Sequence, residues 1–104
     1  MIKIDSSRQV AKMGRYQMTN YKEAIIKLQK YEEFKGNTLS AWRNSQGEYR
    51  IYSYSTPIAI VDTYTNTYTY LNNHKYSVTT SKHQGLVCRA IGSLPLAKNC
   101  EIIY

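Results

Sequence analysis

The stretch between residues 76 and 84 carries the side chains best suited to binding a ligand. It reads YSVTTSKHQ, and an apolar pattern with helical spacing follows it. The candidate binding residues in it are Thr80, Ser81, Lys82, His83 and Gln84. Because free N–H groups at a helix start attract anions, a phosphate or a partner's carboxylate would suit this position. The alternative is structural, since Thr and Ser commonly cap helices without binding anything else.

The two histidines are not expected to be catalytic. His83 precedes Leu86 by three residues and Val87 by four, so in a helix it shares their apolar face. This spacing predicts a buried, hydrogen-bonded histidine. His74 lies in a predicted turn and is expected to be solvated, and without a carboxylate at ligand spacing the two histidines predict no metal site. Cys88 points away from His83 and lies in an apolar neighbourhood that disfavours its thiolate.

Basic residues provide the second functional signal. The 14 Lys and Arg residues outnumber the seven Asp and Glu residues, and the net charge is +7. The cations of interest are Lys75, Lys82 and Arg89 around the last predicted helix, and Arg50 beside the first predicted hairpin. Tyrosines interleave with these cations and would stack on bases where they face outward, so a nucleic-acid or nucleoprotein partner is expected. The alternative is a solvated basic surface over a tyrosine-rich core, because net charge alone indicates only non-specific association.

Two helices and a sheet must position these residues. The first helix is expected over residues 21–34, where an apolar stripe follows a capping Asn20. The second is expected to begin near Thr80 or Ser81 and to end before Pro95. Strands are expected at residues 39–42, 49–54, 58–61, 68–71 and 100–104. The short links between them predict an α+β fold, with an antiparallel sheet of about four to five strands and both helices on one sheet face.

A chain of 104 residues is expected to form one small domain. Residues 1–19 are expected to be an N-terminal extension of uncertain structure, and residues 20–104 the α+β domain. The predicted core consists of Trp42, Ile51, Ile58, Ile60, Leu71, Leu86, Val87 and Ile91, together with Ile25 and Leu28. Cys88 and Cys100 are expected to be free thiols, as in a reducing cytoplasm.

The sequence lacks the motifs of several functional classes. No run of about 18 apolar residues predicts a membrane span, and the first residues lack the apolar centre of a secretory signal. No CxxC, HExxH, GxGxxG or P-loop string occurs. We therefore expect a cytoplasmic, non-enzymatic protein without cofactor, metal or membrane partner. Two further alternatives are an enzyme or sensor that uses the hydroxyl-rich helix start as an anion pocket, and self-association through exposed tyrosines.

Several strings resemble a small domain of unknown function that phages and other mobile elements carry. They are residues 34–41, 49–56, 58–59, 71–72 and 76–84, of which the last is the most specific. The resemblance covers roughly residues 20–92. It implies a small phage protein that binds and inhibits a host defence machine such as a CRISPR nuclease, at its protein surface or in its nucleic-acid channel. The alternative is a general DNA- or RNA-binding accessory protein of a phage or mobile element, and no catalytic role comes with the resemblance.

Overall fold

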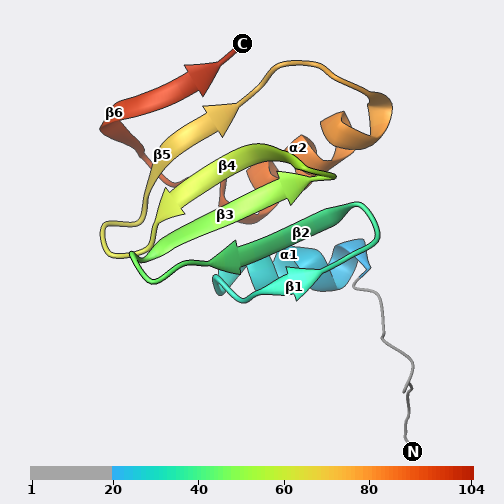
Figure 1. The fold of residues 1–104 in the computed structure, drawn as a ribbon, viewed down its shortest axis with the longest axis horizontal. Helices are drawn as coiled ribbons and strands as arrows, with labels where there is room; N and C mark the ends of the chain where they lie inside the picture. The colour runs from blue at the N-terminus through green and yellow to red at the C-terminus, as the bar shows by residue number, and fades with distance from the viewer. Residues whose placement is uncertain (1–19) are drawn as a thin grey trace, which may run out of the picture.

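The structure is a computed structural model that describes residues 20–104, so the predicted extension over residues 1–19 lies outside the described residues. Two helices and six strands follow one another in this part of the chain (Figure 1). They are α1 (Tyr21–Gln29), β1 (Phe34–Lys35), β2 (Leu39–Arg43), β3 (Glu48–Ser53), β4 (Thr56–Asp62), β5 (Thr67–Asn72), α2 (Val78–Ile91) and β6 (Leu96–Ile103). The predicted α+β class and the two helices are therefore confirmed.

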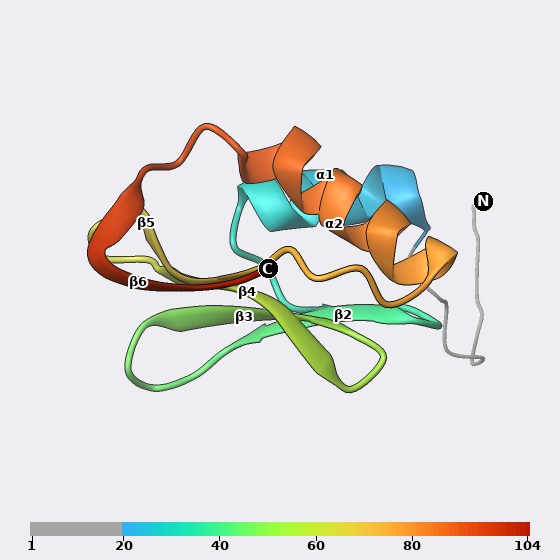
Figure 2. The same cartoon turned by 90° about the horizontal axis from the view of Figure 1, so that it is seen from above.

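Both helices cover the same face of the sheet, as predicted, and the first turns of both lie at the same side of the molecule (Figure 2). The ring of Tyr21 at the start of α1 meets the ring of His83 in α2 edge to face, with centroids 5.8 Å apart. Within residues 20–104 no helix covers the opposite sheet face, which we call the bare face. The molecule therefore has two layers, and the core lies between them.

The sheet is mixed, with the strand order β1-β2-β3-β4-β5-β6. The first five strands form an antiparallel meander, whereas β6 pairs in parallel with β5. The predicted antiparallel sheet of four to five strands is therefore wrong at both edges. β1 has only two residues, too few for an alternating pattern to appear in the sequence. α2 returns the chain to the end of the sheet where β5 begins, and such a helical crossover joins strands in parallel.

Helix α1 begins where the sequence predicts and ends earlier. Asn20 caps it by accepting a hydrogen bond of 2.9 Å from the N–H of Glu23. The helix ends at Gln29 because Tyr31 adopts a left-handed conformation with φ of 56°. The N–H groups of Tyr31 and of the next residue then bond carbonyls in the last turn, which is a Schellman motif. The predicted helical residues from Phe34 onward are thereby free to form β1.

The core lies on the helix-facing side of the sheet. Its largest fully buried side chains are Tyr49, Leu28, Ile51, Ile58, His83, Val61 and Ser53. The predicted α2 residues Leu86, Val87 and Ile91 are buried as well, and Ile25 and Leu71 pack against the core while partly buried. The prediction is wrong for Trp42, which is 44% exposed, and for Ile60, which is partly exposed. Both are the cross-strand partners of Arg50, and therefore share its side of the sheet, the bare face.

Two tyrosines complete the core, and each hydroxyl has a partner inside it. The hydroxyl of Tyr49 donates to the carbonyl of Glu32, and that of Tyr68 donates to the carbonyl of Ile91, both at 2.6 Å. Burial raises the pKa of Tyr49 far above its ordinary value and that of Tyr68 to about 12. Both side chains therefore stay neutral hydrogen-bond donors at any physiological pH.

The turn between β2 and β3 depends on a glycine. Gly47 has φ of 80°, a conformation that side chains disfavour, and a Cβ there would collide with the ring of Tyr64. Asn44 holds the turn because its Oδ1 accepts hydrogen bonds from the N–H groups of Gln46 and Glu48. The predicted turn at this place is therefore confirmed, with a residue requirement that only glycine meets without strain.

Two smaller expectations concern thiols and membranes. Cys88 and Cys100 are free thiols, as predicted. Neither helix in residues 20–104 is long and apolar enough to cross a membrane.

Candidate functional site

The hydroxyl-rich segment forms the first turns of α2. Ser77 caps this helix, and its Oγ accepts a hydrogen bond of 3.1 Å from the N–H of Thr80. The helix begins at Val78, so the predicted start near Thr80 or Ser81 is wrong. The prediction placed the helix start too late because Thr79, Thr80 and Ser81 are all common cap residues. The residue with the extended backbone of a cap is Ser77, just before them.

A cluster of polar side chains, which we call the His83 cluster, joins both helices to the sheet. The Nδ1 atom of the fully buried His83 is hydrogen-bonded to Ser53 Oγ at 2.7 Å. Ser53 Oγ is also bonded to Thr80 Oγ1 at 2.9 Å. On the other side of the ring, Nε2 lies 3.0 Å from Thr38 Oγ1 and 3.3 Å from the hydroxyl of Tyr21. The predicted buried, hydrogen-bonded histidine is therefore confirmed.

The electrostatics of the cluster favour a neutral imidazole. Burial lowers the pKa of His83, and the positive charge of Lys82 lowers it further. Ser53 is fully buried as well, so its hydroxyl has no direct contact with solvent. The predicted binding residues Thr80 and His83 are therefore buried, and they help to pack α2 on β3. The residues of this helix that are open to a ligand are their exposed neighbours.

The exposed candidate residues belong to α2 and to the loop that precedes it. Ser81, Lys82 and Arg89 are exposed on α2, and Lys75 is exposed in the loop before it. Gln84 turns toward that loop, where its Nε2 donates to the carbonyl of Asn72 at 2.7 Å and to that of His74 at 3.0 Å. Gln84 therefore fixes the loop between β5 and α2. His74 is exposed, as predicted.

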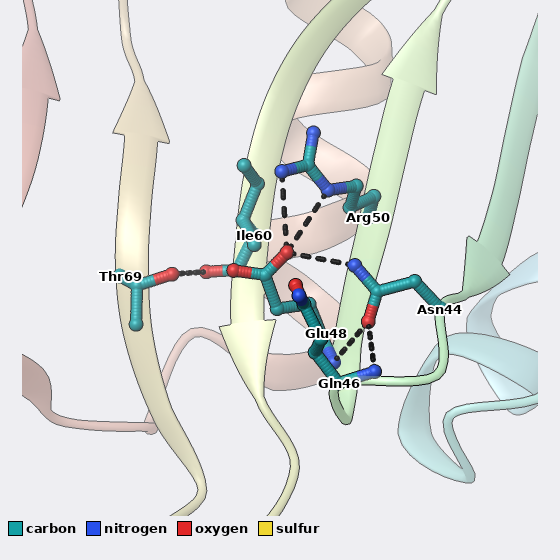
Figure 3. Close-up of polar contacts among 6 residues, drawn as sticks. All are labelled: Asn44, Gln46, Glu48, Arg50, Ile60 and Thr69. Carbon is teal, nitrogen blue, oxygen red and sulfur yellow. Dashed lines mark hydrogen bonds and ion pairs between the residues drawn. The ribbon is translucent and has the colours of Figure 1, made fainter.

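Arg50 does not join the other candidates, because it lies on the bare face of the sheet (Figure 3). Its Nε and Nη2 atoms each donate to Glu48 Oε1 at 3.2 Å, and Asn44 Nδ2 donates to the same oxygen at 2.8 Å. On the neighbouring strands, the hydroxyl of Thr69 in β5 donates a hydrogen bond of 3.4 Å to the carbonyl of Ile60 in β4. Arg50 and the α2 residues therefore lie on opposite faces of the molecule and do not form the single binding site that was predicted.

A cavity of about 440 Å³ adjoins the His83 cluster, and no sequence pattern predicts it. Tyr21 and Thr38, which contact His83, line it, and Tyr54 forms another part of its wall. Tyr54 was expected in a strand, whereas it lies in the β3–β4 turn with φ of 57°. A Tyr-Ser pair between two apolar stretches is a weak turn signal, so the sequence offered little to reveal this position. Among residues 20–104 no group of three His, Cys, Asp or Glu side chains is placed to hold a metal ion.

Comparison with known proteins yields a family but no described relative. No curated protein and no solved structure matches the chain. Residues 11–93 match the profile of a family of unknown function, DUF8033. This match includes the His83 cluster and both helices, and it ends before β6. Because it spans well over half of the sequence, the chain belongs to the DUF8033 family.

Proposed function

We propose that the protein is a non-enzymatic binding module that attaches to nucleic acid, alone or within a nucleoprotein, through the outer side of its helix layer. The observation that carries this proposal is the distribution of charge over the two layers. α2 contains Lys82 and Arg89 and no acidic residue, and Lys75 precedes it. These three cations are exposed, so phosphates can approach them without displacing buried groups.

Helix α1 adds to the same basic layer. Lys22 and Lys30 are exposed on it and directly after it, and Glu23 is the acidic residue within it. The exposed Glu32 and Glu33 that follow are engaged by Lys27 and by the N–H of Arg43, respectively. The bare face differs, because Arg50 is paired there with Glu48, and Asp62 lies directly opposite Glu48 on the neighbouring strand. Phosphate groups are therefore attracted to the helix layer more than to the bare face.

The test measures how binding depends on salt. A short fluorescent single-stranded oligonucleotide is titrated with the full chain at several salt concentrations, because each phosphate contact releases counterions and steepens the loss of affinity. Arg89→Gln should weaken binding and reduce the slope of log affinity against log salt by about one. Arg50→Gln removes the same charge from the bare face and should leave the slope unchanged. Weak binding with a flat salt dependence would refute the proposal.

A second candidate is a protein partner, as the resemblance to phage-borne domains implies. The observation that favours it is on the bare face, where the rings of Trp42 and Tyr52 stack with centroids 4.6 Å apart and Trp42 is 44% exposed. Exposed aromatic rings are enriched at protein interfaces. A host defence nuclease stays the predicted partner of this kind.

A pull-down from host lysate separates the two candidates. After nuclease treatment, a protein partner stays bound and is lost with Trp42→Ala, whereas a nucleic-acid partner disappears. Recovery of neither protein nor nucleic acid, with or without treatment, would contradict both candidates.

A further inference from the structure

The cavity beside the His83 cluster has the size and wall composition of a small-ligand site. Its volume of about 440 Å³ falls within the range of pockets that enclose small molecules. The first residues of α1, the loop between β1 and β2, and the β3–β4 turn all contribute to it, and Thr79 adds the first turn of α2. The cavity therefore lies where the starts of both helices meet the sheet.

Two exposed tyrosines and the buried Phe34 are the aromatic residues that line it. Tyr21 is 40% exposed and Tyr54 is 58% exposed, and their ring centroids lie 5.8 Å and 6.3 Å from that of His83. Tyr54 holds a left-handed backbone with φ of 57°, which is unfavourable for a bulky residue. The 2.6 Å hydrogen bond from its N–H to the carbonyl of Thr38 keeps it there. Strain at an exposed aromatic residue beside a cavity is a mark of functional sites.

The polar groups of the cavity exclude some ligands and suit others. None of its lining residues is acidic, and the imidazole behind it is neutral because burial lowers the pKa of His83. Asn37, Thr38 and Thr79 supply amide and hydroxyl groups. Tyr21 and Thr79 belong to the first turns of α1 and α2. The first turn of α1 holds Glu23, whereas that of α2 holds no acidic residue, so its partial positive charge disfavours cations. A planar aromatic ligand that is neutral or anionic therefore fits this wall.

We infer that the cavity binds one nucleotide, with its base against the rings of Tyr21 and Tyr54 and its phosphate toward the start of α2. This inference rests on the proposed nucleic-acid binding and locates one base of the bound strand. Stacking on tyrosine tolerates any base, because every base has a π-face, so this contact selects a nucleotide without selecting its sequence. The same chemistry is presented by a free mononucleotide and by a single strand.

The experiment measures the binding of adenosine 5′-monophosphate, a short single-stranded oligonucleotide and inorganic phosphate to the full chain by calorimetry. The key variant is Tyr54→Gly, which removes the ring and also relieves the left-handed strain, so the protein should unfold no more easily than the wild type. Binding of the nucleotide should weaken about fivefold or more. Tyr64→Ala, which removes another exposed turn tyrosine outside the cavity, should bind as the wild type does.

The outcomes distinguish this inference from the proposed function. Loss of both probes in Tyr54→Gly supports a site that accepts free nucleotides, and loss of the oligonucleotide alone supports a site that takes its base from a strand. If Tyr54→Gly binds both probes as tightly as the wild type, or if phosphate alone binds as tightly as the mononucleotide, the inference is overturned. The proposed function survives that result as long as Arg89→Gln still weakens oligonucleotide binding and lowers its salt dependence.

Discussion

Replacing Ser53 by alanine tests whether the His83 cluster holds the two layers together. Ser53 Oγ is bonded to His83 Nδ1 and to Thr80 Oγ1, and both Ser53 and His83 are fully buried. Alanine leaves Nδ1 without a partner, whereas Thr80 Oγ1 keeps its contact with Ser77. One orphaned buried polar group costs about 1–3 kcal/mol, so we expect the free energy of unfolding to fall by about 2 kcal/mol.

Urea unfolding followed by far-ultraviolet circular dichroism at neutral pH measures this loss. For a domain of this size each kcal/mol corresponds to about 4–8 °C in melting temperature, so thermal melting gives a second readout. The matched control is Ser55→Ala, two residues along the chain, where the side chain is exposed and the change should lie within about 0.5 kcal/mol of zero. If Ser53→Ala is as stable as Ser55→Ala, the cluster does not stabilise the fold and the reasoning is wrong.

Three further changes test other parts of the structure. The pKa of His83 is lower in the folded state than its ordinary 6.5, so the unfolded chain binds more protons below this pH. Urea titrations should therefore show the free energy of unfolding falling as pH drops below about 6.5. His83→Asn should flatten this pH dependence. Gly47→Ala should lower the free energy of unfolding by about 1 kcal/mol or more in thermal melting, because φ is 80° and the added Cβ collides with Tyr64. Gly85→Ala should raise it by about 0.5–1 kcal/mol, because Gly85 lies within α2 and an added Cβ there meets no other atom. Leu86→Ala should cost about 2–5 kcal/mol in chemical denaturation, since this side chain is 4% exposed, and a loss below 1 kcal/mol would mean that it is not in the core.

Local sequence signals located most elements and failed at their ends. The stripe and cap that predict α1 are correct, but its end depends on Tyr31, a residue that rarely adopts φ of 56°. Its ring packs against Tyr49 and its hydroxyl donates to Asn66, and these contacts stabilise the conformation. These stabilising contacts involve residues distant in the sequence, so no local sequence pattern predicts where α1 ends.

The side of the sheet on which a residue lies depends on strand register. Ile51 was correctly placed in the core, and alternation along β3 then puts Arg50 on the bare face. Trp42 and Ile60 lie on the bare face too, because they are the cross-strand partners of Arg50. They were predicted in the core on the basis of their hydrophobicity alone. Register is set by turns and by two irregularities in strand pairing that the sequence does not display. Ile58 in β4 is an extra residue opposite β3, and Thr69 in β5 is an extra residue opposite β4.

The candidate site shows the same division between local and distant information. The helical spacing of His83 from Leu86 and Val87 predicted its burial, because that relation lies within one helix. Its partners Ser53 and Thr38 are 30 and 45 residues away, and only the packing of α2 on the sheet brings them together. The exposure of Lys82 and Arg89 agrees with the predicted basic surface, whereas Arg50 could be separated from them only after the two layers were known.

The parallel strand β6 has a consequence for association between molecules. It lies beyond the residues that match the family, and it occupies the side of β5 that the antiparallel meander leaves unpaired. The N–H of Tyr68 donates to the carbonyl of Pro95, and that of Asn73 donates to the carbonyl of Ile103, so both ends of β5 are covered from within the chain. An uncovered strand edge is a template for pairing with another copy. β6 therefore removes the edge of β5 from pairing with another copy and becomes the edge strand on this side of the sheet, so edge-to-edge association here would involve β6, which lies outside the family match.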